Sequence, residues 1–397
     1  MVPEEWETST IGDEFHIQLG KMLDTENNVG VSKPFLGNRS VQWGEIDVAN
    51  LGVIKLTNAD IERFRLREGD LLVCEGGEVG RAAIWEKQLD ECYYQKALHR
   101  LRAKRGYDVQ LAKNLLHRYA TTGALSDFVT QTSIAHLPKD KFERLPIPVP
   151  PQVEQRAIAA ALGDVDALLG ALDAAIAKQR DLKQATMQQL LTGQTRLPGF
   201  AGEWETKCLG DLAVFLKGKG LPKSALLPFG RHPCIHYGEL FTKYAEEIRL
   251  IISSTDEARD CVRSSANDVL MPTSDVTPRG LAKASCVIMS GVILGGDILI
   301  IRPDAVRVYG TYLSHVIRRE EEQVLQLVTG TTVFHLYGSD MKKFCFALPP
   351  IKEQNAIVTV LSDMDSEIDS LASRRTKTAA LKQAMMQSLL TGRIRLV

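Results

Sequence analysis

Basic side chains gathered in short stretches are the residues of this sequence best suited to binding phosphates. Arginines alternate with apolar residues from position 63 to 67, as they do along a β-strand, and a denser basic stretch follows at 99–105. A glycine-rich basic loop at 217–223 is flexible enough to follow a phosphate backbone. The basic candidates for DNA contact are Arg63, Arg65, Arg67, Arg100, Arg102, Lys217, Lys219 and Lys223.

A second kind of candidate combines a glycine-rich turn with groups that could read base edges. One such turn runs from Glu75 through Gly76 and Gly77 to Arg81, and Thr273 with Ser274 stands at the corresponding place 198 residues later. Lysine and arginine suit phosphates, whereas glutamate, serine and threonine suit base edges. Each stretch alone also fits an ordinary solvated surface. Their occurrence in two related domains favours DNA.

Motifs that would mark a catalytic site are missing from the sequence. There is no G-x-x-x-x-G-K-[ST] phosphate loop, no G-x-G-x-x-G opening a helix, no H-E-x-x-H and no G-x-S-x-G. The zinc-deaminase signature and the Asn/Asp-Pro-Pro-aromatic tetrapeptide of amino-methyltransferases are missing as well. The sequence therefore predicts a non-catalytic protein with no metal site and no cofactor of its own.

The charge balance limits how such a protein could hold DNA. Its 397 residues carry 48 basic and 49 acidic side chains, a formal net charge of −1. Because binding by counterion release needs many cationic contacts, tight binding would need help from other subunits. Hydrophobic residues make up 44% of the chain, which suffices for packed cores and excludes global disorder.

The termini and cysteines predict the compartment. The acidic N-terminus lacks the apolar core of a signal peptide, and no apolar run approaches the ~20 residues of a membrane helix. Seven scattered cysteines without C-x-x-C spacing argue against a disulfide framework and a zinc site. We expect a cytoplasmic protein without membrane association, whose cysteines are small buried apolar residues.

The elements that position the candidate residues are repeated within the chain. The run PPQVEQ at 150–155 returns 199 residues later as PPIKEQ at 349–354, and the match continues without a gap to the end of the chain. Weaker matches link the segments that precede these runs. The repeat predicts two half-molecules with pseudo-twofold symmetry, each a domain followed by a helical unit, with boundaries at 1–149, 150–197, 198–348 and 349–397.

The sequence of each helical unit predicts one long helix, and we expect the two helices to pack on each other. The first should lie between Pro150-Pro151 and Gly193, since proline is tolerated at a helix start and glycine ends a helix. Apolar residues at alternating steps of four and three predict a coiled-coil seam, and a twofold axis makes the pair antiparallel. The seam residues are Ile158, Leu162, Val165, Leu169 and Leu172, then Ile357, Leu361, Met364, Ile368 and Leu371. Two amphipathic core helices of separate domains are the alternative.

The two remaining segments predict mixed α/β domains, so the fold class is α+β. Short apolar runs bounded by turns predict strands at 70–74, 82–85 and 298–301. One helix is expected before each exit, at 109–119 and 311–327.

Over essentially its full length the chain resembles a DNA specificity subunit of a type I restriction–modification system. The PPxxEQ runs and the LLTG runs at 190–193 and 389–392 resemble the central and distal regions of that family. Segments 20–24, 74–81 and 95–100 resemble one class of target recognition domain, and segments 217–220, 233–240 and 242–244 resemble another. The resemblance adds Lys21, Lys96 and His236 to the candidate DNA contacts.

The resemblance implies two target recognition domains, each reading one half of a split site in double-stranded DNA. The helices would pair as an antiparallel coiled coil, set the spacing and bind two modification (methyltransferase) subunits. Those subunits would supply S-adenosylmethionine, and restriction subunits would add ATP- and Mg-dependent translocation and cleavage. This places the missing catalytic motifs on partners. A coiled-coil interaction scaffold without DNA reading and a self-contained nucleic-acid enzyme remain as alternatives.

Overall fold

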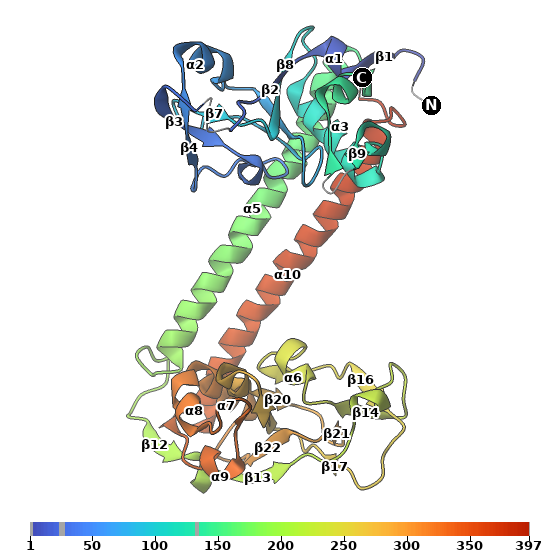
Figure 1. The fold of residues 1–397 in the computed structure, drawn as a ribbon. Helices are drawn as coiled ribbons and strands as arrows, with labels where there is room; N and C mark the ends of the chain where they lie inside the picture. The colour runs from blue at the N-terminus through green and yellow to red at the C-terminus, as the bar shows by residue number, and fades with distance from the viewer. Residues whose placement is uncertain (1–2, 24–27, 132–134, 397) are drawn as a thin grey trace. The chain divides into compact units, whose positions relative to one another are not determined.

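The computed structural model describes residues 3–23, 28–131 and 135–396, so Asp24 of the 20–24 motif lies outside the described residues. The chain divides into two compact units. Unit 1 comprises Met1–Ala175 and Leu371–Val397, and unit 2 comprises Ile176–Ser370. Each unit therefore contains one mixed α/β domain, part of the long helix that follows it and part of the other long helix (Figure 1).

The domain of unit 1 is built on a four-stranded antiparallel sheet in the order β2-β8-β5-β6. Strand β5 is buried at every residue, which explains its uniformly apolar sequence LLVC. A three-stranded sheet, β4-β3-β7, encloses a second small core. The strands of unit 1 are β1 (Glu7–Thr10), β2 (Phe15–Leu19), β3 (Val31–Leu36), β4 (Gly52–Leu56), β5 (Leu71–Cys74), β6 (Ala82–Ile84), β7 (Tyr93–Tyr94), β8 (Leu98–Ala103), β9 (Thr130–Gln131), β10 (Ala135–His136) and β11 (Pro146–Val149).

Helix α3 packs the domain of unit 1 against the segments of the long helices in that unit. Its first turn is capped by the Asp108 side chain, which accepts a hydrogen bond from the Leu111 amide at 2.9 Å, and it ends at Gly123 with φ +76°. The apolar face of α3 joins the main core of the unit, which also takes in Ile158 and Leu162. The domain's helices are α1 (Ile11–Glu14), α2 (Asn58–Phe64), α3 (Val109–Thr122) and α4 (Lys139–Glu143).

The domain of unit 2 repeats this plan with larger sheets. A five-stranded sheet runs β13-β22-β18-β20-β15, and a four-stranded sheet runs β16-β14-β21-β17. The strands are β12 (Glu205–Cys208), β13 (Ala213–Lys217), β14 (His232–Ile235), β15 (Glu247–Ile248), β16 (Ser253–Thr255), β17 (Val262–Arg263), β18 (Asp268–Pro272), β19 (Ser274–Asp275), β20 (Ser285–Val287), β21 (Ile293–Leu294), β22 (Ile298–Pro303), β23 (Phe334–His335) and β24 (Cys345–Leu348). The helices are α6 (Glu239–Thr242), α7 (Gly310–Arg319), α8 (Glu321–Leu327) and α9 (Gly338–Met341), with short 3-10 turns η3 (Leu209–Asp211), η4 (Lys223–Ala225) and η5 (Pro278–Ala282).

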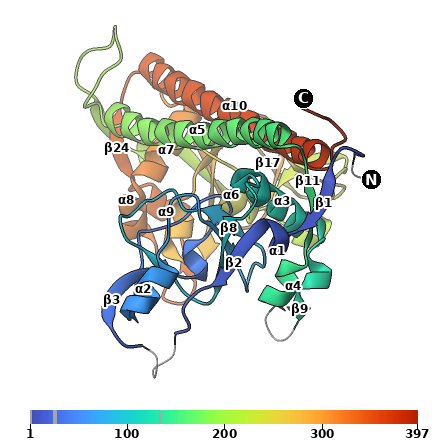
Figure 2. The same cartoon turned by 90° about the horizontal axis from the view of Figure 1, so that it is seen from above.

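The two long helices, α5 (Gln152–Leu190) and α10 (Ile351–Leu389), are antiparallel as predicted. In each unit their segments lie side by side (Figures 1 and 2). Partners on α10 have falling residue numbers as those on α5 rise. The pairs are Asp166–Lys382 at 2.5 Å and Asp173–Arg375 at 3.0 Å in unit 1, and Gln179–Glu367 at 2.9 Å and Lys183–Asp365 at 2.5 Å in unit 2.

The apolar seam is most deeply buried where each helix meets a domain. Six of its residues are buried, namely Ile158, Leu162, Leu172, Ile357, Leu361 and Ile368. The other four are half-buried, namely Val165, Leu169, Met364 and Leu371. The first turns of α5 and α10 therefore serve as core elements of the domains as well as parts of the helix pair.

Two local predictions differ from the structure. The helix expected at 311–327 is divided into α7 and α8, because Glu320 has φ −85° and ψ 39°, outside the helical region. The alternating stretch 63–67 is not a strand, since Arg63 lies in the last turn of α2 and the following residues connect α2 to β5. Basic and apolar residues alternate there because the side chains of Phe64 and Leu66 are buried in the second small core of unit 1, while the arginines that alternate with them are exposed.

The cysteine prediction was wrong at one pair. Cys208 and Cys345 form a disulfide, because the antiparallel register of β12 and β24 places them directly opposite each other. The prediction is correct for Cys74, Cys92, Cys234 and Cys286, which are free and buried, while Cys261 is free and half-buried. Among the described residues, no helix combines the length and apolarity needed to cross a membrane.

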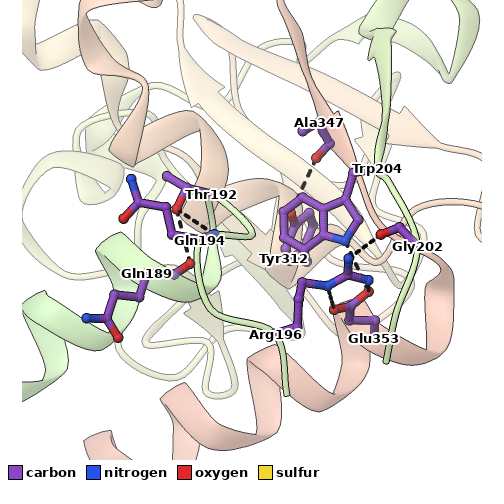
Figure 3. Close-up of polar contacts among 9 residues, drawn as sticks. All are labelled: Gln189, Thr192, Gln194, Arg196, Gly202, Trp204, Tyr312, Ala347 and Glu353. Atoms are coloured by element: carbon purple, nitrogen blue, oxygen red, sulfur yellow. Dashed lines mark hydrogen bonds and ion pairs between the residues drawn. The ribbon is translucent and has the colours of Figure 1, made fainter. Parts of the chain in front are cut away.

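A buried glutamate fixes the start of each long helix, and we call it the glutamate anchor. In unit 1, Glu154 is fully buried and receives two hydrogen bonds from Arg395, at 2.6 and 2.8 Å, and one from the Trp6 indole at 2.9 Å. In unit 2, Glu353 receives two from Arg196, both at 2.6 Å, and one from Trp204 at 3.1 Å (Figure 3). Each arginine follows the end of one helix and binds the start of the other.

The neighbouring glutamine joins the same helix start to the domain. The Gln155 side chain accepts from the Asp108 amide at 2.9 Å and donates to the Pro150 carbonyl at 2.8 Å. Gln354 repeats this, accepting from the Tyr309 amide and donating to the Pro349 carbonyl, both at 2.8 Å. The PPxxEQ run is therefore a structural joint between helix pair and domain.

Replacing Glu154 by glutamine should destabilise unit 1 by about 2 kcal/mol, because the Arg395 guanidinium loses its bidentate carboxylate and keeps only its more exposed pair with Glu5. Urea unfolding of the purified chain measures the change. Glu203→Gln, at an exposed position, is the matched control and should leave stability unchanged. Equal free energies of unfolding for the two variants would show that the anchor does not contribute to the stability of the fold.

The pH dependence of the same anchor has a defined sign. Burial alone would raise the pKa of Glu154, but hydrogen bonds from Arg395 and Trp6 outweigh it and hold this pKa below the ordinary 4.5. A lowered carboxyl pKa stabilises the folded state above the unfolded-state pKa, and this stabilisation is lost as pH falls through the folded-state pKa. The stability gap between the parent chain and Glu154→Gln should therefore narrow below pH 4.5.

Candidate nucleic-acid interface

The loop after β2 in unit 1 and the loop after β13 in unit 2 follow the same backbone course. In unit 2 the Gly218 amide donates to the Ile298 carbonyl at 2.9 Å, and a Cβ there would lie 1.9 Å from the Gly295 oxygen. In unit 1 the Gly20 amide donates to the Leu98 carbonyl, and its Cβ would lie 2.2 Å from the Gln95 oxygen. Only glycine fits this close approach, so the loops carrying Lys21 and Lys219 are equivalent.

The lysines of the unit 2 loop are available to a ligand. Lys217 is 66% exposed and lies 3.6 Å from Asp297, and Lys219 is 57% exposed and pairs with Asp260. Exposed pairs of this kind contribute little, so phosphate can compete for both lysines. Lys223 is exposed in the turn η4. In unit 1, by contrast, Lys21 is largely buried and bound to Asp60 at 2.8 Å.

Glu75 and Thr273 occupy the same backbone position at the ends of β5 and β18. The Glu75 amide donates to Ala97 and its carbonyl accepts from Leu137, while Thr273 makes the same bonds with Asp297 and Leu336. Glu75 is half-buried, and burial raises its pKa against the opposing influence of Lys96 and His136. Lys96 is exposed beside it.

The residues around Thr273 line a cavity of about 520 Å³ in unit 2. Thr273 is 8% exposed, and its hydroxyl has no hydrogen-bond partner among the described residues. Ser274 and the His335 ring share a hydrogen bond of 2.9 Å, and the His335 ring stacks on Tyr337, with centroids 6.1 Å apart. Lys217 and Lys342 complete the lining with two cations.

His335, Tyr337 and Lys342 are functional candidates that the sequence analysis did not select. The repeat carries a signal for the first of them, since His136-Leu137 matches His335-Leu336. Tyr337 and Lys342 carry no such signal, because their proximity to Thr273 follows from the pairing of β19 with β23.

The arginines selected in unit 1 lie in three environments. Arg63, Arg65 and Arg67 are exposed around the end of α2. Arg81 is 14% exposed, pairs with Glu78 at 3.2 Å and donates to the Asn38 carbonyl at 2.8 Å.

Arg100 and Arg102 in β8 are engaged within the domain. Arg102 makes a bidentate pair with Asp70, at 2.5 and 2.8 Å, and Arg302 repeats it with Asp268, at 2.8 and 2.8 Å. Arg100 is 7% exposed and donates to the Arg63 carbonyl at 3.0 Å. This geometry favours a structural role for both residues over DNA contact.

His236 is half-buried between β14 and α6. Its Nδ1 accepts from the Gly238 amide at 3.1 Å, its ring lies 4.6 Å from that of Tyr237, and burial lowers its pKa. The position orders the turn into α6, and a DNA contact there stays a prediction.

Comparison with known proteins agrees with the repeat. Residues 3–179 and 201–379 each match the family model for the type I restriction modification DNA specificity domain. Two specificity subunits of Methanocaldococcus jannaschii are similar: a putative type I restriction enzyme subunit named MjaX and a type I restriction enzyme subunit named MjaVIII. Each is 23% identical over 99% of this chain, covering 95% and 94% of the relatives respectively.

Solved structures share the fold. The S subunit of a type I restriction-modification system from M. genitalium superposes with a TM-score of 0.60 at 15% identity, covering 98% of this chain and 96% of that one. A chain from a structure of a type I R-M system gives a TM-score of 0.61 at 16% identity, covering 99% and 100%. The chain belongs to the type I restriction–modification DNA specificity family and carries two copies of its domain.

Proposed function

We propose that this chain is the non-catalytic specificity subunit of a type I restriction–modification complex and that each of its domains reads one half of a split DNA site. The observation that carries the proposal is the double match to the specificity domain, in residues 3–179 and 201–379. Two kinds of loop at equivalent backbone positions in the two domains support it: lysine-bearing loops, and turns that carry a carboxylate in unit 1 and hydroxyls in unit 2. Lysines that contact phosphates position a protein on duplex DNA, and hydroxyls and carboxylates can read the edges of the bases.

The long helices would set the distance between the half-sites. A helix of 39 residues is roughly 60 Å long. Half-sites read from one face of B-DNA lie about one turn, or ~34–36 Å, apart. An antiparallel pair of such helices can span that separation and resist bending better than either helix alone.

The partners would be two modification (methyltransferase) subunits docked on the helices and, in a complete complex, restriction subunits. We propose that S-adenosylmethionine, ATP and Mg bind to those partners, since the sequence of this chain has no motif for them. The net charge of −1 also supports partners that share in holding DNA. A scaffold that pairs helices without reading DNA is the second candidate, favoured by the ion pairs along α5 and α10.

Deleting the gene should abolish one split adenine-methylated motif in the host's methylated-base map. Restoring the gene should restore that motif. Persistence of every split motif after deletion would refute the DNA-reading function and leave the scaffold.

Lys217→Ala with Lys219→Ala should weaken binding of the assembled complex to all DNA sequences about equally. Loss of phosphate contacts should reduce the slope of log K against log salt by about 1 per lysine. Gel shifts at several salt concentrations measure this, with Lys207→Ala on β12 as the control. An unchanged slope would remove this loop from the interface.

Ile368→Asp should lower the yield of complex with the modification subunits, because it places a charge in the buried helix seam. Ser370→Asp adds the same charge at an exposed position of α10 and should assemble normally. Co-purification of the subunits measures both. Equal subunit ratios in the two variants would contradict a role of the seam in assembly.

A further inference from the structure

The equivalent positions at the ends of β5 and β18 share their backbone but differ in chemistry. The amide and carbonyl of Glu75 and of Thr273 bond to matching residues, as described above. The residue that follows is bridged to a histidine in both units: Gly76 to His136, and Ser274 to His335. The scaffold is thus held constant while the functional groups presented change from a carboxylate to two hydroxyls.

The surroundings differ in the same place. In unit 1 the carboxylate of Glu75 lies near Lys96 and the His136 ring, whose influence on its pKa opposes that of burial. In unit 2 the corresponding cavity of about 520 Å³ holds Thr273, Ser274 and His335, and the exposed Tyr337 stands beside them. Thr273 is 8% exposed and its hydroxyl has no partner within the described part of the chain, so this cavity has hydrogen-bonding capacity that those residues do not use.

Each set of groups matches a different base edge. An ionised glutamate only accepts hydrogen bonds, so it suits an exocyclic amino group, N4 of cytosine or N6 of adenine. A hydroxyl both donates and accepts, so it also suits the carbonyl and ring-nitrogen acceptors of guanine and thymine. A residue that serves only phosphate would have no reason to be acidic in one half of the chain.

We propose that this position, Glu75 in unit 1 and Thr273 with Ser274 in unit 2, contacts a base edge and gives the two domains different sequence preferences. His136 and His335 orient the contacts from the neighbouring strand as positioning residues. The inference rests on the proposed function, since it assigns the reading of one base in each half-site to these side chains.

Reciprocal exchange tests the proposal in the assembled complex. Glu75→Thr should change or relax the preference at one base of one half-site by at least about tenfold, leaving the other half-site unchanged. Thr273→Glu should act on the other half-site alone. Methylation of a plasmid library with randomised half-sites, read by sequencing, gives the preference at every position.

Milder variants guard against misfolding. Glu75→Gln keeps the shape of the side chain and removes its charge, and Ser274→Ala removes one hydroxyl from the cavity. Glu75→Gln should change the base preference in the same half-site as Glu75→Thr. Ser274→Ala should change it in the same half-site as Thr273→Glu. Glu7→Gln changes an exposed carboxylate on β1 of the same unit, outside the turn that carries Glu75, and should leave the motif unchanged.

The outcomes separate this inference from the proposed function. If the parent complex methylates no split motif, the proposed function fails. If parent and variants methylate the same motif with the same preference at every base, the function stands and the inference is wrong. A motif changed by Glu7→Gln and not by Glu75→Gln would also overturn it.

Discussion

The buried carboxylates of Glu154 and Glu353 are the interaction on which the rest of the structure depends. A carboxylate at 0% exposure is tolerated only when charged and neutral donors satisfy its oxygens, and each receives an arginine fork and an indole. The arginine comes from beyond the end of one helix, the indole from the residue before the first strand of a domain, and the carboxylate from the start of the other helix. In unit 1 this fixes three segments distant in sequence at one point. In unit 2, where Arg196 and Trp204 belong to the same connecting segment, it fixes two.

The sequence predicted the helices and their pairing well because both follow from local periodicity and from the repeat. It could not predict what the PPxxEQ run does. The partners of Glu154 lie 148 and 241 residues away, at Trp6 and Arg395, and no local pattern connects them. The same holds for Cys208 and Cys345, which are 137 residues apart and meet only through the register of two strands.

Charge density along the chain was a poor guide to the candidate site. The densest basic stretch falls on β8, where Arg102 is bound to Asp70 and Arg100 is buried. The pairs Asp70–Arg102 and Asp268–Arg302 each link the two neighbouring central strands of a sheet at one end. Sequence shows how many cations a segment carries, whereas their availability to DNA depends on which acidic partners the fold brings near them. In unit 2 that distinction leaves Lys217 and Lys219 exposed and brings in His335 and Tyr337.

The division between repeated and diverged residues follows from these roles. The glutamate anchors, the glutamine joints and the close-approach glycines are the same in both units because each meets a strict geometric requirement. The ends of β5 and β18 meet no such requirement, since the backbone alone makes the shared hydrogen bonds there. Side chains at these positions can change without weakening the joint between domain and helices. In the function proposed above, such a near-neutral chain would vary its selectivity while the anchors maintain its stability. Partner subunits would then contribute the non-specific attraction to DNA that the net charge of −1 does not supply.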